Sequence, residues 1–127
     1  MSRIEHFAIY ASDIGALRDF YVDALGLRVL LDNSRGDPAG YFLGDDGGMA
    51  LEIIERPAGD SAVNQRYVCH VAFGVEDVAA TRTALENRGI RFETETAVQN
   101  AAMHTAFFND PEGNRCQIVW RKQPLGA

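Results

Sequence analysis

Two of the three histidines of the chain occupy matching positions of an internal repeat. The stretch Glu5–Ile14 (EHFAIYASDI) returns as Cys69–Val78 (CHVAFGVEDV), so that His6 corresponds to His70. A sequence that repeats itself in this way folds as two similar structural units. Imidazole nitrogens are common ligands of divalent transition metals, and a repeat that supplies one from each half indicates a shared centre.

The later part of the repeat matches a carboxylate with its amide. Asp45–Ile53 corresponds to Asp110–Ile118, which places Glu52 against Gln117. Two imidazoles with two oxygen donors suit Fe, Ni, Co, Zn or Mn better than Ca or a thiolate-preferring metal. If folding brings the halves together, the sequence predicts a divalent metal centre with the ligands His6, Glu52, His70 and Gln117.

Strand periodicity places the four candidate ligands on one kind of face. His6 alternates with the apolar Phe7 and Ile9, Gln117 alternates with Cys116 and Ile118, and the other two candidates follow the same pattern. Side chains of a strand point alternately to opposite faces, so the apolar set packs on helices and the polar set does not. Polar groups on the second face of a curved sheet would line a cavity.

The elements expected to position these residues come in the same order twice. The first half predicts a strand, a helix and three strands at residues 3–11, 14–25, 27–32, 40–43 and 49–55. The second half repeats them at residues 67–75, 78–88, 90–94, 103–109 and 114–121, with 95–102 left as a loop. Ser12 and Asp13 offer N-cap oxygens for the first helix, Glu76 and Asp77 cap the second, and Gly26 and Gly89 are predicted stops.

The predicted fold class is therefore α+β. Two βαβββ modules are expected to form a curved eight-stranded mixed sheet around a metal or ligand cavity. A chain of 127 residues fits one domain. Its expected parts are module one at 1–55, a linker at 56–66, module two at 67–122 and a tail at 123–127.

Composition limits the classes of partner. A net charge of −6 argues against binding to nucleic acid or to an anionic membrane surface, which leaves a small-molecule partner. No apolar run is long enough to span a membrane, and the first residues lack a secretory core, so we expect a cytoplasmic protein. Cys69 and Cys116 alternate with candidate ligands and are expected to be buried thiols.

Three further side chains are of interest. Tyr10 shares a face with His6 and is a candidate for the substrate pocket. His104 precedes the Asp110 turn on a predicted strand and is a second pocket candidate, although it has no histidine partner in the repeat. Trp120 lies on the same strand face as Ile118, opposite to Gln117, so we expect it to pack against a helix or a partner chain.

The repeated βαβββ order, the openings Ile4-Glu5-His6 and Val68-Cys69-His70, and the signature FFNDPEGN at Phe107–Asn114 resemble the vicinal oxygen chelate superfamily. This superfamily includes glyoxalases, extradiol dioxygenases, methylmalonyl-CoA epimerases, fosfomycin-resistance enzymes and bleomycin-binding proteins. The resemblance covers nearly the whole chain. It implies metal ligands at the four positions given above, and it implies a homodimer.

Gln117 departs from the pattern of the family. The enzymes named above generally have Glu there, and in glyoxalases that Glu is the catalytic base. Gln donates a carbonyl oxygen but cannot accept a proton from a substrate. Because the halves are related by an approximate twofold axis, Glu52 completes the same two-histidine, one-carboxylate set. Our hypothesis is that Glu52 is both a ligand and the base, acting on a metal-chelated substrate that passes through an enediolate.

Three functions stay open at this level. The first is a metal-dependent glyoxalase-like lyase or isomerase that acts on a small oxygenated metabolite. The second is an extradiol-type dioxygenase with the exchanged ligand triad. The third is a non-catalytic protein that binds a drug or metabolite, as bleomycin-resistance proteins do. The first two make the chain an enzyme, and the third needs no metal.

Overall fold

The chain divides into two compact units, residues 1–62 and 63–127. The structure is a computed structural model that describes residues 5–56 and 70–125. The predicted linker, apart from Arg56, and Cys69 lie outside the described residues, as does the start of the predicted strand at 67–75. Each unit contains its own sheet and its own helix.

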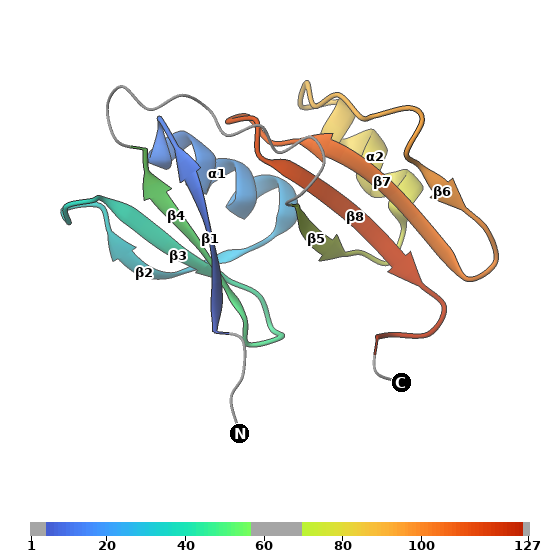
Figure 1. The fold of residues 1–127 in the computed structure, drawn as a ribbon, viewed down its shortest axis with the longest axis horizontal. Coiled ribbons are helices and arrows are strands. Elements are labelled where there is room, and N and C mark those ends of the chain that lie inside the picture. The colour runs from blue at the N-terminus through green and yellow to red at the C-terminus, as the bar shows by residue number, and fades with distance from the viewer. Residues whose placement is uncertain (1–4, 57–69, 126–127) are drawn as a thin grey trace. The chain divides into compact units, whose positions relative to one another are not determined.

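The first unit is a four-stranded mixed sheet with one helix (Figure 1). Its strands are ordered β1-β4-β3-β2, with β1 and β4 parallel and the other pairs antiparallel. The elements are β1 (His6–Ala11), α1 (Ile14–Leu25), β2 (Arg28–Asn33), β3 (Gly40–Gly44) and β4 (Ala50–Glu55).

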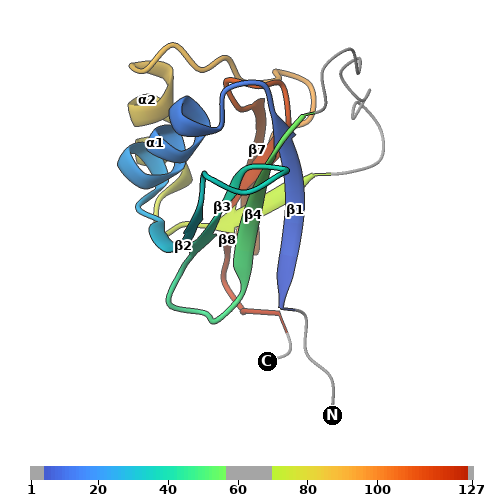
Figure 2. The same ribbon diagram turned by 90° about the vertical axis from the view of Figure 1, so that its left-hand side faces the viewer.

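Helix α1 begins and ends where the sequence predicts. The side chain of Asp13 accepts a hydrogen bond from the backbone N–H of Ala16 at 2.9 Å, which satisfies one of the unpaired donors of the first turn. Gly26 ends the helix in the left-handed conformation, with φ of 73°. Leu17 and Tyr21 are buried, and the helix packs against β3 and β4 on one face of the sheet (Figure 2).

The second unit repeats this architecture with the strand order β5-β8-β7-β6. Asp77 caps α2 by accepting from the N–H of Ala80 at 2.9 Å. At the other end Gly89 has φ of 88°, and the N–H of Ile90 donates to the carbonyl of Leu85 at 3.1 Å. The elements are β5 (Val71–Gly74), α2 (Val78–Glu86), β6 (Val98–Gln99), β7 (Met103–Asn109) and β8 (Arg115–Arg121).

The core of each unit lies between the sheet and its helix. Alternate residues of the strands are buried on this side, and the largest fully buried side chains besides the helix residues are Phe108, Leu43, Ile53, Ile118 and Cys116. Cys116 is a free and fully buried thiol, as predicted. The period-two pattern therefore identified the core face of both sheets correctly.

The predicted strand at 90–94 is wrong. Only Phe92 forms an isolated bridge there, to Phe108, and the short edge strand β6 lies instead within the segment expected to be a loop. Glu93 accepts hydrogen bonds from Arg115 and from the hydroxyl of Thr96. These side-chain contacts hold the segment in bends after Glu93, so it leaves the sheet edge before pairing resumes at Val98.

The α+β fold of two βαβββ modules is confirmed. Among the described residues, the ladders join strands of the same unit, so the eight strands form two four-stranded sheets. The single curved sheet around a cavity stays a prediction. No helix of the described residues is both long and apolar enough to cross a membrane.

Candidate functional site

The candidate ligands lie on the side of each sheet that faces away from its helix. In the first unit Leu51 and Ile53 are buried beneath the helix, whereas Glu52 between them points to the other side. Phe42 pairs with Glu52 across β3 and β4 and shares that side. We call this side the ligand face of the first sheet, and it also carries His6 and Tyr10.

His6 and Glu52 approach each other on this face. The Nε2 atom of His6 lies 3.5 Å from the Oε1 atom of Glu52, and both side chains are partly exposed. Two ligand atoms bound to one ion at about 2.1 Å each lie about 3.0–3.4 Å apart at ordinary coordination angles. The separation of 3.5 Å is just above this range, so a small movement of either side chain would give the ligand spacing of one transition-metal ion.

Glu5 orients the imidazole of His6. Its Oε1 atom lies 3.0 Å from Nδ1 of that ring. An ionised carboxylate only accepts hydrogen bonds, so this contact favours a proton on Nδ1, and in the neutral imidazole Nε2 then has the lone pair. A carboxylate behind a histidine in this way fixes the tautomer needed for binding a metal through Nε2. Sequence analysis did not single out Glu5.

The second unit repeats the arrangement around His70. Gln117 pairs with Ala72 of β5 and with Phe107 of β7, as Glu52 pairs with Ala8 and Phe42. The ring of His70 stands at 80° to that of Phe107 with centroids 5.2 Å apart, and His6 stands at 82° to Phe42 with centroids 5.4 Å apart. Each unit thus supplies one imidazole, one oxygen donor and one supporting aromatic ring.

Phe42 and Phe107 occupy corresponding positions of the repeat, one residue before Leu43 and Phe108. The repeat alignment therefore contained a signal for them that the search for polar ligands passed over. An aromatic ring perpendicular to an imidazole is a favourable arrangement for ring quadrupoles.

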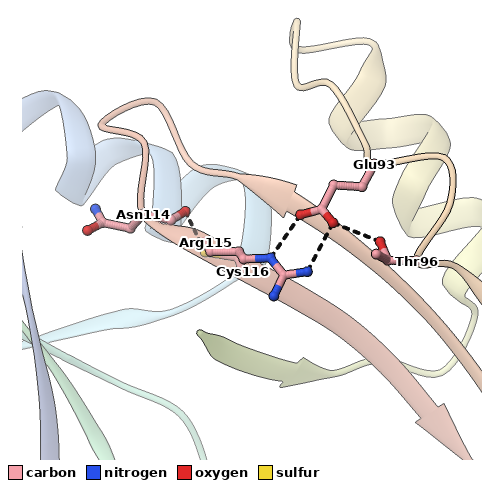
Figure 3. A network of polar contacts seen from close by, with 5 residues as sticks. All are labelled: Glu93, Thr96, Asn114, Arg115 and Cys116. Carbon is pink, nitrogen blue, oxygen red and sulfur yellow. Dashed lines mark hydrogen bonds and ion pairs between the residues drawn. The ribbon is translucent and has the colours of Figure 1, made fainter. Parts of the chain in front are cut away.

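The ligand face of the second sheet, which carries Phe107, Arg115 and Gln117, also holds an ion pair (Figure 3). The Nε and Nη2 atoms of Arg115 donate to the two carboxylate oxygens of Glu93, both at 2.9 Å. These hydrogen bonds raise the pKa of Arg115. The guanidinium carbon lies 4.0 Å from the centre of the Phe107 ring. In the repeat, Ala50 stands where Arg115 does.

The FFNDPEGN signature forms the turn between β7 and β8. The Oδ1 atom of Asp110 accepts from the N–H groups of Glu112 and Asn114, and its Oδ2 atom accepts from the side-chain amide of Asn114, all at 2.9 Å. Gly113 adopts φ of 88°, a conformation that glycine takes without strain. The turn fixes where β8 begins, and hence which residue of β8 reaches the ligand face.

The four candidate ligands are thus placed as two pairs. His6 contacts Glu52 in the first unit. In the second unit Phe107 contacts the ring of His70 and pairs with Gln117 across β7 and β8. Among residues 5–56 and 70–125, no three His, Cys, Asp or Glu side chains gather as a metal-binding group. The joining of both pairs on one ion stays a prediction.

The two pocket candidates are placed differently. Tyr10 lies on the ligand face of the first sheet and is 45% exposed. His104 pairs with Trp120, their rings are 5.2 Å apart, and both lie on the side of the second sheet that carries the buried Ala106 and Ile118. His104 therefore lies on the opposite side from Gln117, so it does not enter the site proposed below.

Comparisons with known proteins show the family and the fold of this chain. The family model of the Glyoxalase/Bleomycin resistance protein/Dioxygenase superfamily matches residues 3–118. Uncharacterized protein YaeR of Escherichia coli is 30% identical over 126 residues, 89% of this chain and 92% of that protein. A lactoylglutathione lyase of Haemophilus influenzae is 30% identical over 127 residues, 94% of this chain and 93% of that protein. The trypanothione-dependent glyoxalase I of Leishmania major has the same fold, with a TM-score of 0.79 at 24% identity over 96% of this chain and 88% of that one.

Proposed function

We propose, since this chain belongs to the Glyoxalase/Bleomycin resistance protein/Dioxygenase superfamily, that it is a metal-dependent lyase or isomerase of the glyoxalase kind. Its substrate would be a small oxygenated metabolite with a carbonyl beside an acidic C–H. The observation that supports this most directly is the approach of His6 Nε2 to Glu52 Oε1 at 3.5 Å, with Glu5 holding the other ring nitrogen.

The proposed metal ligands are His6, Glu52, His70 and Gln117. The ion would be one of the divalent transition metals Fe, Ni, Co, Zn or Mn, which accept a mixed nitrogen and oxygen donor set. When bound, such an ion supplies Lewis-acid polarisation of a substrate carbonyl. Tyr10, on the same face as His6, would contribute to the wall of the substrate pocket.

Glu52 is the proposed general base. Its carboxylate would accept the proton from the carbon beside the carbonyl and return it to the neighbouring carbon, so that the overall change is a proton shift without an oxidant. Gln117, the corresponding residue of the second unit, has no titratable group and cannot do this. The lyase class is further supported by the name of the Haemophilus influenzae relative, lactoylglutathione lyase.

The test compares Glu52→Gln with Glu55→Gln. Both remove a carboxylate from β4, but Glu55 ends the strand and is exposed, so it serves as the matched control. Each variant is loaded with metal, its metal content is measured, and exchange of the substrate C–H with deuterium is followed by NMR on 2-oxoaldehydes with and without glutathione. We expect Glu52→Gln to lose about 10²–10⁴-fold in exchange rate at full metal content, with Glu55→Gln unchanged. Unchanged exchange in metal-loaded Glu52→Gln would refute the base role.

A second candidate function is supported by Gln117. With a neutral amide at Gln117, the other three donors are two histidines and one carboxylate, which is the ligand set of non-heme Fe(II) oxygenases. Oxygen uptake with catechols by the iron-loaded protein, with no proton exchange on 2-oxoaldehydes, would favour an extradiol-type dioxygenase. Failure of tag-free protein to hold any transition metal after reconstitution would favour a drug- or metabolite-binding protein.

A further inference from the structure

The ion pair of Arg115 and Glu93 lies on the ligand face of the second sheet, yet none of the steps above uses it. Arg115 extends from β8 to Glu93 (Figure 3). On the way its guanidinium carbon lies over the ring of Phe107 of β7. The Arg115 side chain is 15% exposed and the Glu93 side chain 33% exposed. The hydroxyl of Thr96 donates to the same carboxylate at 2.8 Å. Such a group is held in one position from several sides.

The geometry argues against a role for Arg115 in binding an anionic substrate. Its Nε and Nη2 atoms both donate to Glu93, so one of the two guanidinium edges that bind carboxylates and phosphates through two hydrogen bonds is already occupied. The carboxylate also neutralises the positive charge locally. The guanidinium carbon lies over the Phe107 ring, 4.0 Å from its centre.

Phe107 passes this constraint on to His70. A guanidinium face against an aromatic ring is attractive, and it limits the orientations that the ring adopts. The perpendicular contact between Phe107 and His70, with centroids 5.2 Å apart, depends on that orientation. Glu93, Arg115, Phe107 and His70 therefore form a continuous series of contacts that ends on a proposed metal ligand.

We propose that Arg115, fixed by Glu93, is a positioning residue that holds the imidazole of His70 through Phe107. This inference rests on the proposed function, in which His70 is a metal ligand. The first unit has Ala50 at the matching position and fixes His6 through Glu5 instead. The two halves of the site thus orient their histidines by different means, and loss of Arg115 disturbs His70 alone.

The first test uses the metal-free protein, so it does not depend on the metal. The chain has three histidines, so imidazole NMR spectra contain three spin systems, which single His→Gln variants assign. We expect Phe107→Leu and the double variant Glu93→Leu/Arg115→Leu to shift the ring resonances of His70 and to leave those of His6 in place. The double variant removes both charges and so avoids an unpaired carboxylate. Far-UV circular dichroism checks that each variant is folded.

The second test measures Co²⁺ binding by chelator competition and by the visible absorption of bound Co²⁺. Supporting residues of metal ligands typically change metal affinity 10–100-fold, so we expect the Kd to rise at least about tenfold and the absorption band to shift in both variants. Phe107→Tyr keeps the ring and should retain wild-type affinity. The matched control is Arg18→Leu, because Arg18 also pairs with a carboxylate and lies over an aromatic ring, Tyr41, but on the helix side.

The outcomes separate this inference from the proposed function. The positioning role would be overturned if the folded double variant bound Co²⁺ as tightly as the wild-type protein and its His70 resonances did not shift. The proposed function would be unaffected by that result, provided that the wild-type protein itself binds Co²⁺. An equal loss of affinity in Arg18→Leu would also overturn it, since the effect would then be general destabilisation. No Co²⁺ binding by the wild-type protein would refute the proposed metal site, and the apo spectra would then decide the role of Arg115 alone.

Discussion

Gln117 is the proposed ligand at which this chain departs from the family pattern expected from the sequence, and replacing it with Glu gives a direct test of its position. Gln117→Glu replaces a neutral carbonyl donor with an anionic one, and added ligand charge strengthens cation binding. We predict that the Kd for Zn²⁺ falls about tenfold or more. Gln123→Glu is the control, because it makes the same change in charge at an exposed position near the end of the described chain.

The measurement is chelator competition on both variants at fixed pH and ionic strength. An equal gain in Zn²⁺ affinity in the two variants would show that the effect comes from net charge. No gain in Gln117→Glu would place residue 117 outside the ligand set.

For single residues, the repeat and the strand alternation together predicted which face of the sheet a side chain takes. The repeat and the strand alternation both pointed to His6 and Glu52, and their side chains meet. His104 had only its place on a strand, and the register of β7 against β8 puts it beside Trp120 on the helix side. Arg115 gave no signal at all, because its role depends on contacts with residues of other elements.

At the scale of the element, the two corresponding turns differ in how strongly their aspartates are held. Asp110 is 4% exposed and accepts three hydrogen bonds from Glu112 and Asn114. Asp45, its counterpart, is exposed and accepts from the N–H of Gly47 at 2.8 Å. Loss of the buried acceptor leaves donors unsatisfied, so Asp110→Ala should lower the free energy of unfolding by about 3 kcal/mol.

Asp45→Ala should lower the free energy of unfolding by less than about 1 kcal/mol, because water replaces an exposed acceptor. Urea unfolding of both variants, followed by circular dichroism, measures the difference. Similar losses in the two variants would show that the β7–β8 turn contributes no more than its counterpart.

Gly40 is a second element-scale test, since the sheet leaves no room beside it. A Cβ atom at Gly40 would lie 2.5 Å from the carbonyl oxygen of Ile53, which is backbone and cannot move aside. At Gly74 the same atom would meet no described atom within 4 Å. We predict that Gly40→Ala destabilises the protein by about 1–3 kcal/mol and that Gly74→Ala changes stability by less than about 0.5 kcal/mol. Thermal unfolding checks both, and a tolerated Gly40→Ala would contradict the close approach of β3 and β4.

Elements were predictable where local chemistry defines them. Asp13 and Asp77 cap the helices as expected, because a cap needs only residues within one turn of the chain. The prediction of a strand at 90–94 failed because it depended on apolar alternation alone. Arg115 binds Glu93 from a distant strand, and an alternation pattern carries no information about such a contact.

At the scale of the whole molecule, each unit supplies half of the proposed ligand set. His6 and Glu52 belong to the first unit, and His70 and Gln117 to the second. The duplicated sequence was enough to predict two βαβββ modules, because each module forms its ladders from its own strands. Whether a first unit combines with the second unit of its own chain or of another chain is a separate question. Periodicity within a module holds no information about partners outside that module.

The family resemblance implies a homodimer, and we predict that each metal site takes one unit from each chain. His6→Ala and His70→Ala should each abolish metal binding when pure. If the two variants are unfolded together and refolded as a mixture, half of the dimers contain one of each, and one of their two sites then regains both histidines. The mixture should therefore bind about a quarter of the wild-type amount of metal.

Sites built within one chain give the opposite result, because every chain in the mixture carries a defective unit and no exchange of partners repairs it. Metal content after refolding, measured against wild-type protein treated identically, decides between the two. Light scattering on the same samples establishes that dimers are present. A mixture of dimers that binds no metal would show that both units of each site belong to one chain.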